Sequence, residues 1–174
     1  MKRFFLLTSL SALLFTAVTA SAQDDKAKRP SPPAKATQTL ASGALITIDY
    51  SSPALKGRTI GKDVEPKKGE VWRAGANEAT VFATSKNITV EGKTLPAGKY
   101  GFYVLSGDKD WTLIFNKKSD LWGADGYEQL NDALRVNVTP GKSATPQERL
   151  TYTISKAGKV SLVWGTLDLS FTVK

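Results

Sequence analysis

From about residue 44 onward, apolar side chains alternate with polar ones at every second position. Ile46, Ile48 and Tyr50 fall on one face of an extended chain, with Thr47 and Asp49 on the other. Alternation of period two predicts β-strands with one buried face. It recurs in residues 99–105, 133–138, 149–155, 160–164 and 167–173. Turn residues separate these segments, and no long helical pattern follows the N-terminal region, so the pattern indicates an all-β chain.

The spacing of these strands predicts an antiparallel β-sandwich or a jelly-roll-like domain. Residues 111–116 are apolar on both faces and predict a central strand. The tripeptide Glu91-Gly92-Lys93 is typical of a tight hairpin between two short strands. The expected core consists of Ile46, Ile48, Phe102, Val104, Leu113, Phe115, Leu150, Ile154, Leu162, Leu169 and Phe171.

Residues 1–22 have the pattern of a signal peptide. Lys2 and Arg3 precede an apolar run from Phe4 to Val18, and Ala20-Ser21-Ala22 gives the small residues that signal peptidase accepts. The run is shorter than the roughly 20 residues that span a bilayer. We expect cleavage after Ala22, export to the periplasm or the extracellular space, and no integral membrane span in the mature chain. The alternative is an uncleaved N-terminal anchor.

Residues 23–43 are rich in Lys, Pro, Ala, Ser and Thr, and Leu40 is their one large apolar residue. Such a segment buries too little surface to offset its chain entropy, which predicts a flexible tether. The alternative is a first edge strand at Thr37–Ala41. The β-domain is then expected to occupy residues 44–174.

The composition removes several kinds of chemistry. The chain has no cysteine and no histidine, so it lacks disulfides, thiol nucleophiles, the commonest general base and the commonest zinc ligand. The formal net charge is +8, but the lysines fall mostly in turns and form no stripe with interleaved aromatic residues. We therefore expect no nucleic-acid partner, no metal and no cofactor. The positive charge indicates a solvated surface or weak attraction to an anionic envelope.

The segment at residues 71–80 differs from the strands around it, because Trp72, Arg73, Asn77 and Glu78 crowd together among small residues. In a functional interpretation, the indole stacks on a ligand while the three polar side chains bind a sugar or a peptide. In a structural interpretation, the indole closes the end of the domain, Arg73 pairs with Glu78, and Asn77 caps backbone groups of the turn. The sequence leaves both interpretations open.

Two loops, at residues 51–69 and 117–131, are too long for hairpin turns, and loops of this length are often functional. Arg58 in the first loop either holds an anionic group or forms a surface ion pair of little energetic value. Trp122 in the second loop either stacks on a ligand or folds the loop onto the sheet. The candidate ligand-binding residues are therefore Arg58, Trp72, Arg73, Asn77, Glu78 and Trp122. No residue is assigned a catalytic role.

Several blocks of the chain resemble, in the same order, a family of secreted bacterial proteins. The blocks are Ile48–Pro53 with Lys56–Arg58, Val71–Thr80, Val90–Lys93 with Leu95–Gly101, and Trp111–Asn116. The family is catalogued only as a domain of unknown function, number twenty-nine eleven. The resemblance covers residues 45–173. It implies a secreted bacterial origin, and it implies no reaction.

We expect a non-enzymatic, exported binding module whose partner is a polar ligand, such as a carbohydrate or a peptide, or an envelope component. One alternative is a hydrolase of glycans or small molecules, which would need two carboxylates roughly 5–10 Å apart across a cleft. Asp49, Glu70 and Glu78 are the candidates for that pair. The other alternative is a purely structural envelope protein, which the exposure of Trp72 or Trp122 would argue against.

Overall fold

The computed structural model describes residues 25–174. The expected signal peptide at residues 1–22 lies outside the described residues. The strands in chain order are β1 (Pro33–Thr39), β2 (Leu45–Ser51), β3 (Val71–Trp72), β4 (Thr80–Thr84), β5 (Ile88–Val90), β6 (Lys93–Leu95), β7 (Gly98–Leu105), β8 (Trp111–Asn116), β9 (Asp132–Val138), β10 (Gly141–Ile154) and β11 (Lys159–Thr172). A single turn of 3-10 helix, η1 (Gln129–Asn131), precedes β9.

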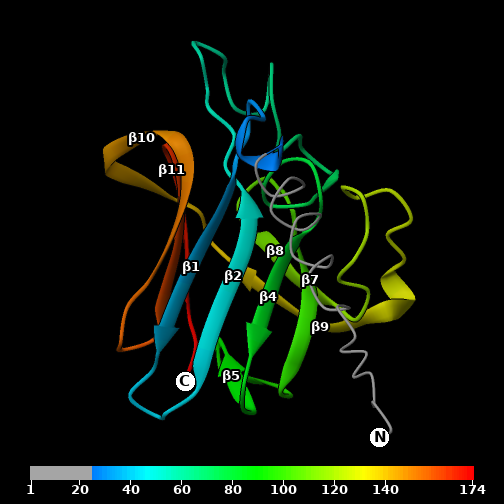
Figure 1. Cartoon of the computed structure of the whole chain (residues 1–174), viewed down its shortest axis with the longest axis vertical. Helices are drawn as coiled ribbons and strands as arrows, with labels where there is room; N and C mark the ends of the chain where they lie inside the picture. Colours follow the sequence, from blue (N-terminus) through cyan, green and yellow to red (C-terminus); the bar gives the residue numbers. More distant parts are fainter. Residues whose placement is uncertain (1–24) are drawn as a thin grey trace, which may run out of the picture.

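The strands form antiparallel sheets, which confirms the predicted all-β class (Figure 1). The largest sheet has the order β1-β2-β4-β7-β8-β9, and β3 pairs with the C-terminal end of β7. Strands β10 and β11 form a long hairpin beside β1. Strands β5 and β6 form the short hairpin predicted at Glu91-Gly92-Lys93, and both Glu91 and Gly92 have the positive φ that a tight hairpin turn requires.

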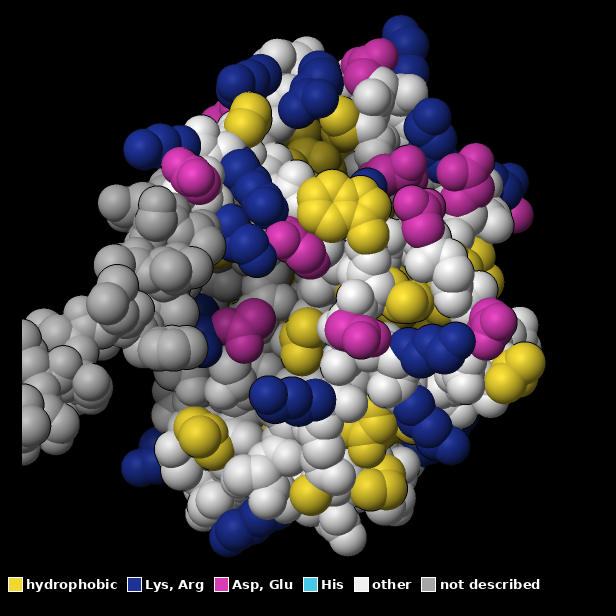
Figure 2. Space-filling view, turned by 45° about the vertical axis from the view of Figure 1, so that its right-hand side comes forward, with side chains coloured by type: hydrophobic (Ala, Val, Ile, Leu, Met, Phe, Trp, Pro, Cys, Tyr) yellow, Lys and Arg dark blue, Asp and Glu magenta, His cyan; other side chains and the backbone are white. Residues whose placement is uncertain are grey.

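The surface carries charges of both signs side by side. Figure 2 shows Lys and Arg side chains interspersed with Asp and Glu across one face. Exposed ion pairs such as Lys118–Glu128, with 3.1 Å between Nζ and Oε2, account for part of this mixing. Within residues 25–174, no helix is long and apolar enough to cross a membrane.

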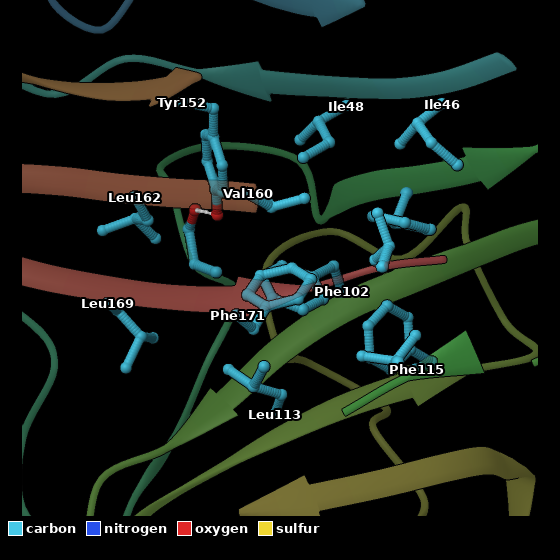
Figure 3. Packing of buried hydrophobic residues seen from close by; sticks show 14 of the residues in the cluster. Ile46, Ile48, Phe102, Leu113, Phe115, Tyr152, Val160, Leu162, Leu169 and Phe171 are labelled. Atoms are coloured by element: carbon cyan, nitrogen blue, oxygen red, sulfur yellow. Dashed lines mark hydrogen bonds between the residues drawn. The ribbon is translucent and has the colours of Figure 1, made fainter. Parts of the chain in front are cut away.

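The main core lies between one face of the large sheet and the β10–β11 hairpin. Phe102 and Phe115 of the large sheet pack with ring centroids 5.2 Å apart, and Phe171 of β11 lies 5.8 Å from Phe102 (Figure 3). Every residue of the predicted core belongs to this cluster or packs on it, although Ile154 is only half-buried. The prediction of the core from alternation is therefore confirmed.

A second, smaller cluster covers the opposite face of the large sheet. Tyr103 of β7 and Ile114 of β8 are buried there, against Leu121 and Tyr127 of the long loop at residues 117–131. This loop explains why β8 is apolar on both faces, and its place between β7 and β9 confirms that β8 is a central strand.

The N-terminal part of the domain differs from the expectation of a flexible tether at residues 23–43. Residues 33–39 form β1, an edge strand that pairs with β2 in unbroken register from Pro33 opposite Ser51 to Thr39 opposite Leu45. The strand buries little side-chain surface, so its main-chain hydrogen bonds to β2 hold it in place. Such backbone bonds produce no hydrophobic alternation in the sequence. The alternative edge strand at Thr37–Ala41 overlaps only the end of β1.

The C-terminal pair of predicted strands is also different in the structure. The segments 160–164 and 167–173 belong to one strand, β11, which continues through Gly165 at φ +54. The register with β10 shifts in this region, between Lys142 and Thr151. A glycine inside a strand is typical of such a bulge, because it accepts a backbone conformation that other residues avoid.

Candidate functional site

Trp72 closes one end of the main core. It lies on β3, is 2% exposed, and stacks on Trp164 of β11 with 6.1 Å between ring centroids and 15° between planes. Its Nε1 donates to the carbonyl of Gly75 at 3.0 Å. The only polar atom of this indole is therefore used within the turn that follows it.

The turn after Trp72 has a strained and tightly held backbone. Ala74 and Asn77 have φ values of +51° and +57°, in the left-handed region that residues other than glycine rarely adopt. The Ala74 carbonyl accepts hydrogen bonds from Thr80 Oγ1 at 3.1 Å and from the Tyr152 hydroxyl at 2.7 Å. These bonds from β4 and β10 fix the conformation. We call residues 72–80 the corner.

Asn77 and Glu78 hold the segment that leads into β1. Asn77 Nδ2 donates to the carbonyl of Ser31 at 3.0 Å. Glu78 receives Lys26 Nζ and Arg29 Nη1, each at 3.0 Å. Burial alone would raise the pKa of Glu78, but hydrogen bonds from its own backbone N–H, Lys26 and Arg29 outweigh that effect and lower the pKa to about 2. Residues 26–31 are thus an internal partner for these two side chains.

Arg73 contacts the loop of residues 117–131 at Gly123, the residue that follows Trp122. Arg73 Nη1 donates to the carbonyl of Asn77 at 3.1 Å, and the guanidinium packs so closely on Gly123 that a side chain there would collide with it. Glu78 and Trp122 form an isolated backbone bridge. The Trp122 side chain is 56% exposed. The expected pair of Arg73 with Glu78 does not form.

A cavity of about 300 Å³ opens between the corner and the loop of residues 51–69. We call it the corner cavity, and its wall includes Arg58, Asp63, Glu65, Trp72, Arg73 and Trp164. Three of the six candidate residues, Arg58, Trp72 and Arg73, therefore share one concavity. Asn77 and Glu78 do not line it. Glu78 lines a separate cavity of about 190 Å³ with Lys26, Arg29 and Asp49.

Four charged side chains of the corner cavity hydrogen-bond to the backbone of their own segments. Asp63 Oδ2 accepts from the backbone N–H of Thr59, and Glu65 Oε2 from that of Lys67, both at 2.9 Å. Arg58 donates to the carbonyls of Leu55 and Ala54, and Arg73 donates to that of Asn77. Among residues 25–174, none of these four side chains takes part in a salt bridge.

Trp164, like Asp63 and Glu65, is a residue of this site that the sequence analysis did not single out. It is 2% exposed, and its Nε1 has no hydrogen-bond partner within the described part of the chain. A buried donor without a partner costs about 1–3 kcal/mol. In the sequence, Trp164 is only an apolar position in an alternating strand. The sequence therefore does not show that its Nε1 lacks a hydrogen bond, whereas that of Trp72 has one.

The tyrosine hydroxyl of Tyr103 is the second buried polar atom without a partner in residues 25–174. It belongs to the cluster under the loop of residues 117–131, not to the corner cavity. Burial, with a smaller effect of Asp120, raises the pKa of Tyr103 to about 12, against the opposing effect of Arg73. This hydroxyl stays protonated at any ordinary pH.

The arrangement of carboxylates gives little support to hydrolysis. Glu78 is held ionised by Lys26 and Arg29, and Asp49 pairs with Lys35 at 3.0 Å. A general acid needs a raised pKa, whereas that of Glu78 is lowered to about 2. Among residues 25–174 there is no group of three or more side chains that would hold a metal ion.

Comparison with known proteins places the chain in a family. The family model described as "Protein of unknown function (DUF2911)" matches residues 31–173, and the chain belongs to this family. The match begins just before β1, in agreement with the strand observed there. No curated protein and no solved structure matches the chain.

Proposed function

We propose that the protein is an exported, non-enzymatic binding module, and that the corner cavity receives a small polar ligand. The large sheet and the β10–β11 hairpin would serve as the two layers of a β-sandwich or jelly-roll-like scaffold. The observation that carries the proposal is the corner cavity of about 300 Å³, whose wall combines the charged side chains of Arg58, Asp63, Glu65 and Arg73 with Trp72 and Trp164.

Two physical arguments support this choice of site. Several charged side chains converge on one concavity beside apolar residues, which is the usual lining of a site for a small polar ligand. The cavity is also flanked by a rigid corner on one side and a long loop on the other, which is the usual arrangement for binding residues on a β-scaffold.

The proposed location follows from the N-terminal pattern. A basic start, a short apolar run and a small-x-small site support export with cleavage after Ala22. The ligand would then be a molecule of the periplasm or the extracellular space, or a component of the envelope.

The test is a binding screen with the mature chain, residues 23–174. Thermal unfolding would be followed with a panel of monosaccharides, uronic acids and short peptides. A ligand present at a hundred times its Kd adds about 2.7 kcal/mol to stability, which is easily seen as a rise in Tm. We expect at least one panel member to bind, and Arg73→Gln, a change in the cavity wall, to weaken its binding about tenfold.

The matched control for this screen is Lys99→Gln. Lys99 is exposed at the opposite end of β7 from the corner, because Trp72 pairs with Val104 near the other end of the strand. Binding by this variant should equal that of the wild type. A panel without any stabilising member, or binding that Arg73→Gln leaves unchanged, would contradict the corner cavity as the site.

A further inference from the structure

The segment of residues 26–32, which we call the strap, is attached to the rest of the domain by two of its three basic residues. Lys26 Nζ and Arg29 Nη1 each lie 3.0 Å from Glu78 Oε1. By contrast, Lys28 is exposed, and within residues 25–174 its one ion pair is with the nearby Asp25, at 4.0 Å. Two cations that are three positions apart therefore contact a single carboxylate of the corner.

The domain also binds the backbone of the strap. Three consecutive carbonyl groups accept hydrogen bonds from it: Pro30 from Arg149 Nη1 at 3.3 Å, Ser31 from Asn77 Nδ2 at 3.0 Å, and Pro32 from the backbone N–H of Ser52 at 2.9 Å. Proline has no N–H, so Pro30 and Pro32 bring acceptors without a donor that would need a partner. The surface under the strap, which we call the strap site, thus recognises basic side chains and backbone carbonyl groups.

The strap is packed loosely on this site. A cavity of about 190 Å³ remains beneath it, lined by Lys26 and Arg29 of the strap and by residues of β2 and β4 such as Asp49 and Val81. None of residues 26–32 is buried. A segment with few buried contacts opens at low cost in free energy, and salt weakens exposed ion pairs. The strap therefore has the properties of a bound ligand that can leave.

The strap site belongs to the family domain, whereas the cations that occupy it do not. The family model matches residues 31–173, which include Glu78, while Lys26 and Arg29 precede the match. Without these two side chains the lining of the cavity holds two carboxylates, Asp49 and Glu78, and no basic residue. Asp49 has its own ion pair within the domain. Glu78 is then the charge that a cation from outside the domain would meet.

We propose that the strap site binds a basic, proline-containing peptide segment of another protein chain, and that the chain's own strap occupies the site in cis. The inference goes beyond the ligand of the corner cavity, whose lining shares no residue with that of the cavity under the strap. A tethered segment competes with an outside peptide at an effective concentration of about a millimolar. A peptide in trans therefore binds well only when the strap has left the site.

The experiment measures binding of the strap sequence in trans. A fluorescent peptide with the sequence of residues 25–33 is titrated into the mature chain, residues 23–174, at low ionic strength, and anisotropy reports binding. The double variant Lys26→Gln/Arg29→Gln removes both cations of the strap and leaves Glu78 in place. We expect this variant to bind the peptide at least about tenfold more tightly than the wild type, whose strap competes. Salt at about 0.5 M should weaken the binding.

Matched changes identify the groups that recognise the peptide. Lys28→Gln removes a positive charge of the strap that does not contact Glu78, so this variant should bind the peptide as weakly as the wild type. Glu78→Gln, added to the double variant, should weaken peptide binding at least about tenfold, because it removes the carboxylate that both cations contact. A peptide with glutamine at both basic positions, 26 and 29, should lose affinity to the same extent.

Circular dichroism and the Tm of each variant show whether the fold is retained. If the double variant does not fold, Arg29→Gln alone replaces it, because Lys26 then still contacts Glu78. The single change should give an increase in peptide affinity of the same direction and smaller size.

Three results would overturn the inference. A folded double variant that binds no peptide would show that the strap is a fixed part of the domain. Equal binding by the wild type and the double variant would show that the strap and the peptide do not compete for one site. Binding that survives Glu78→Gln, or that the peptide keeps without its two basic residues, would show that the contact between Glu78 and the cations is not what is recognised.

Discussion

Arg29 donates from one guanidinium nitrogen to both carboxylate oxygens of Glu78, at 3.0 Å to each. The two residues are 49 positions apart, and the contact joins the segment before β1 to the corner. Asn77 reinforces it through the carbonyl of Ser31. Two side chains that the sequence offers as ligand-binding candidates are thus occupied by the chain's own N-terminal segment. The corner therefore organises the edge of the sheet, while Arg58, Trp72 and Arg73 line the corner cavity.

The hydrogen bonds that Glu78 accepts from its own backbone N–H, from Lys26 and from Arg29 predict a pH-dependent contribution to stability. The pKa of Glu78 is lowered from 4.5 to about 2 in the folded chain, so the ionised carboxylate stabilises the fold above pH 4.5. This contribution is lost as the pH falls from about 4.5 towards 2. Because the Glu78 side chain is 39% exposed, solvent screening reduces its size to about 1 kcal/mol.

The measurement is urea unfolding of the wild type and Glu78→Gln at pH 7, 4.5 and 2.5. The difference in free energy of unfolding should be about 1 kcal/mol at pH 7 and should shrink at pH 2.5. Glu70→Gln is the control, since Glu70 is exposed and takes part in none of the salt bridges of residues 25–174. A difference that stays constant with pH would contradict the role given to the Glu78 charge.

The core predicts large losses for truncation on either side of it. Phe115→Ala in β8 and Leu169→Ala in β11 should each lower the free energy of unfolding by about 2–5 kcal/mol, because both side chains are buried in the main core. Leu130→Ala removes a leucine that is 83% exposed and should change stability by less than about 0.5 kcal/mol. Denaturant unfolding checks all three. A loss below about 1 kcal/mol at both core positions would mean that the sheet and hairpin do not share this core.

Gly75 predicts a steric requirement at the corner. A methyl group there would lie 2.8 Å from Thr80 Oγ1 and 3.2 Å from the carbonyl oxygen of Ser51, so Gly75→Ala should cost about 1–3 kcal/mol. Gly141→Ala is the matched control, since its nearest neighbour, the carbonyl oxygen of Asp168, is 3.7 Å away. Equal Tm values for the two variants would show that the corner relaxes freely.

Export gives a prediction about the N-terminus of the mature chain. The signal pattern of residues 1–22 predicts that the exported protein begins at or near Gln23. Intact-mass spectrometry of the protein recovered from the periplasm or the medium measures this directly. Recovery of a chain that still begins at Met1 would contradict it.

The sequence predicts those parts of the fold that depend on side-chain burial. Alternation identifies the core of β7, β8 and β11, and the two apolar faces of residues 111–116 indicate the central strand. Alternation does not predict strand β1, because backbone hydrogen bonds to β2 hold this strand. For the site, the sequence identifies Arg58, Trp72 and Arg73, which share a cavity, but not the partners of Asn77 and Glu78. Those partners lie far away in the chain, and only the folded structure brings them near.

The stacked pair of Trp72 and Trp164 offers a direct test of the hydrogen bonds beneath the corner. Both indoles are 2% exposed, and phenylalanine would remove a similar volume from each. Trp72→Phe also breaks the hydrogen bond to the Gly75 carbonyl and leaves that oxygen unpaired, whereas Trp164→Phe removes a donor that has no partner in residues 25–174. We therefore expect Trp72→Phe to be less stable than Trp164→Phe by about 1–3 kcal/mol in urea unfolding without ligand.

The outcome distinguishes a bonded from an unbonded indole at Trp164. If Trp164→Phe is as unstable as Trp72→Phe, the Trp164 Nε1 already has a hydrogen-bond partner in solution, because its loss then costs as much as the loss of the bond from Trp72 to Gly75. If Trp164→Phe is the more stable of the two variants, the buried donor is unpaired in the folded protein.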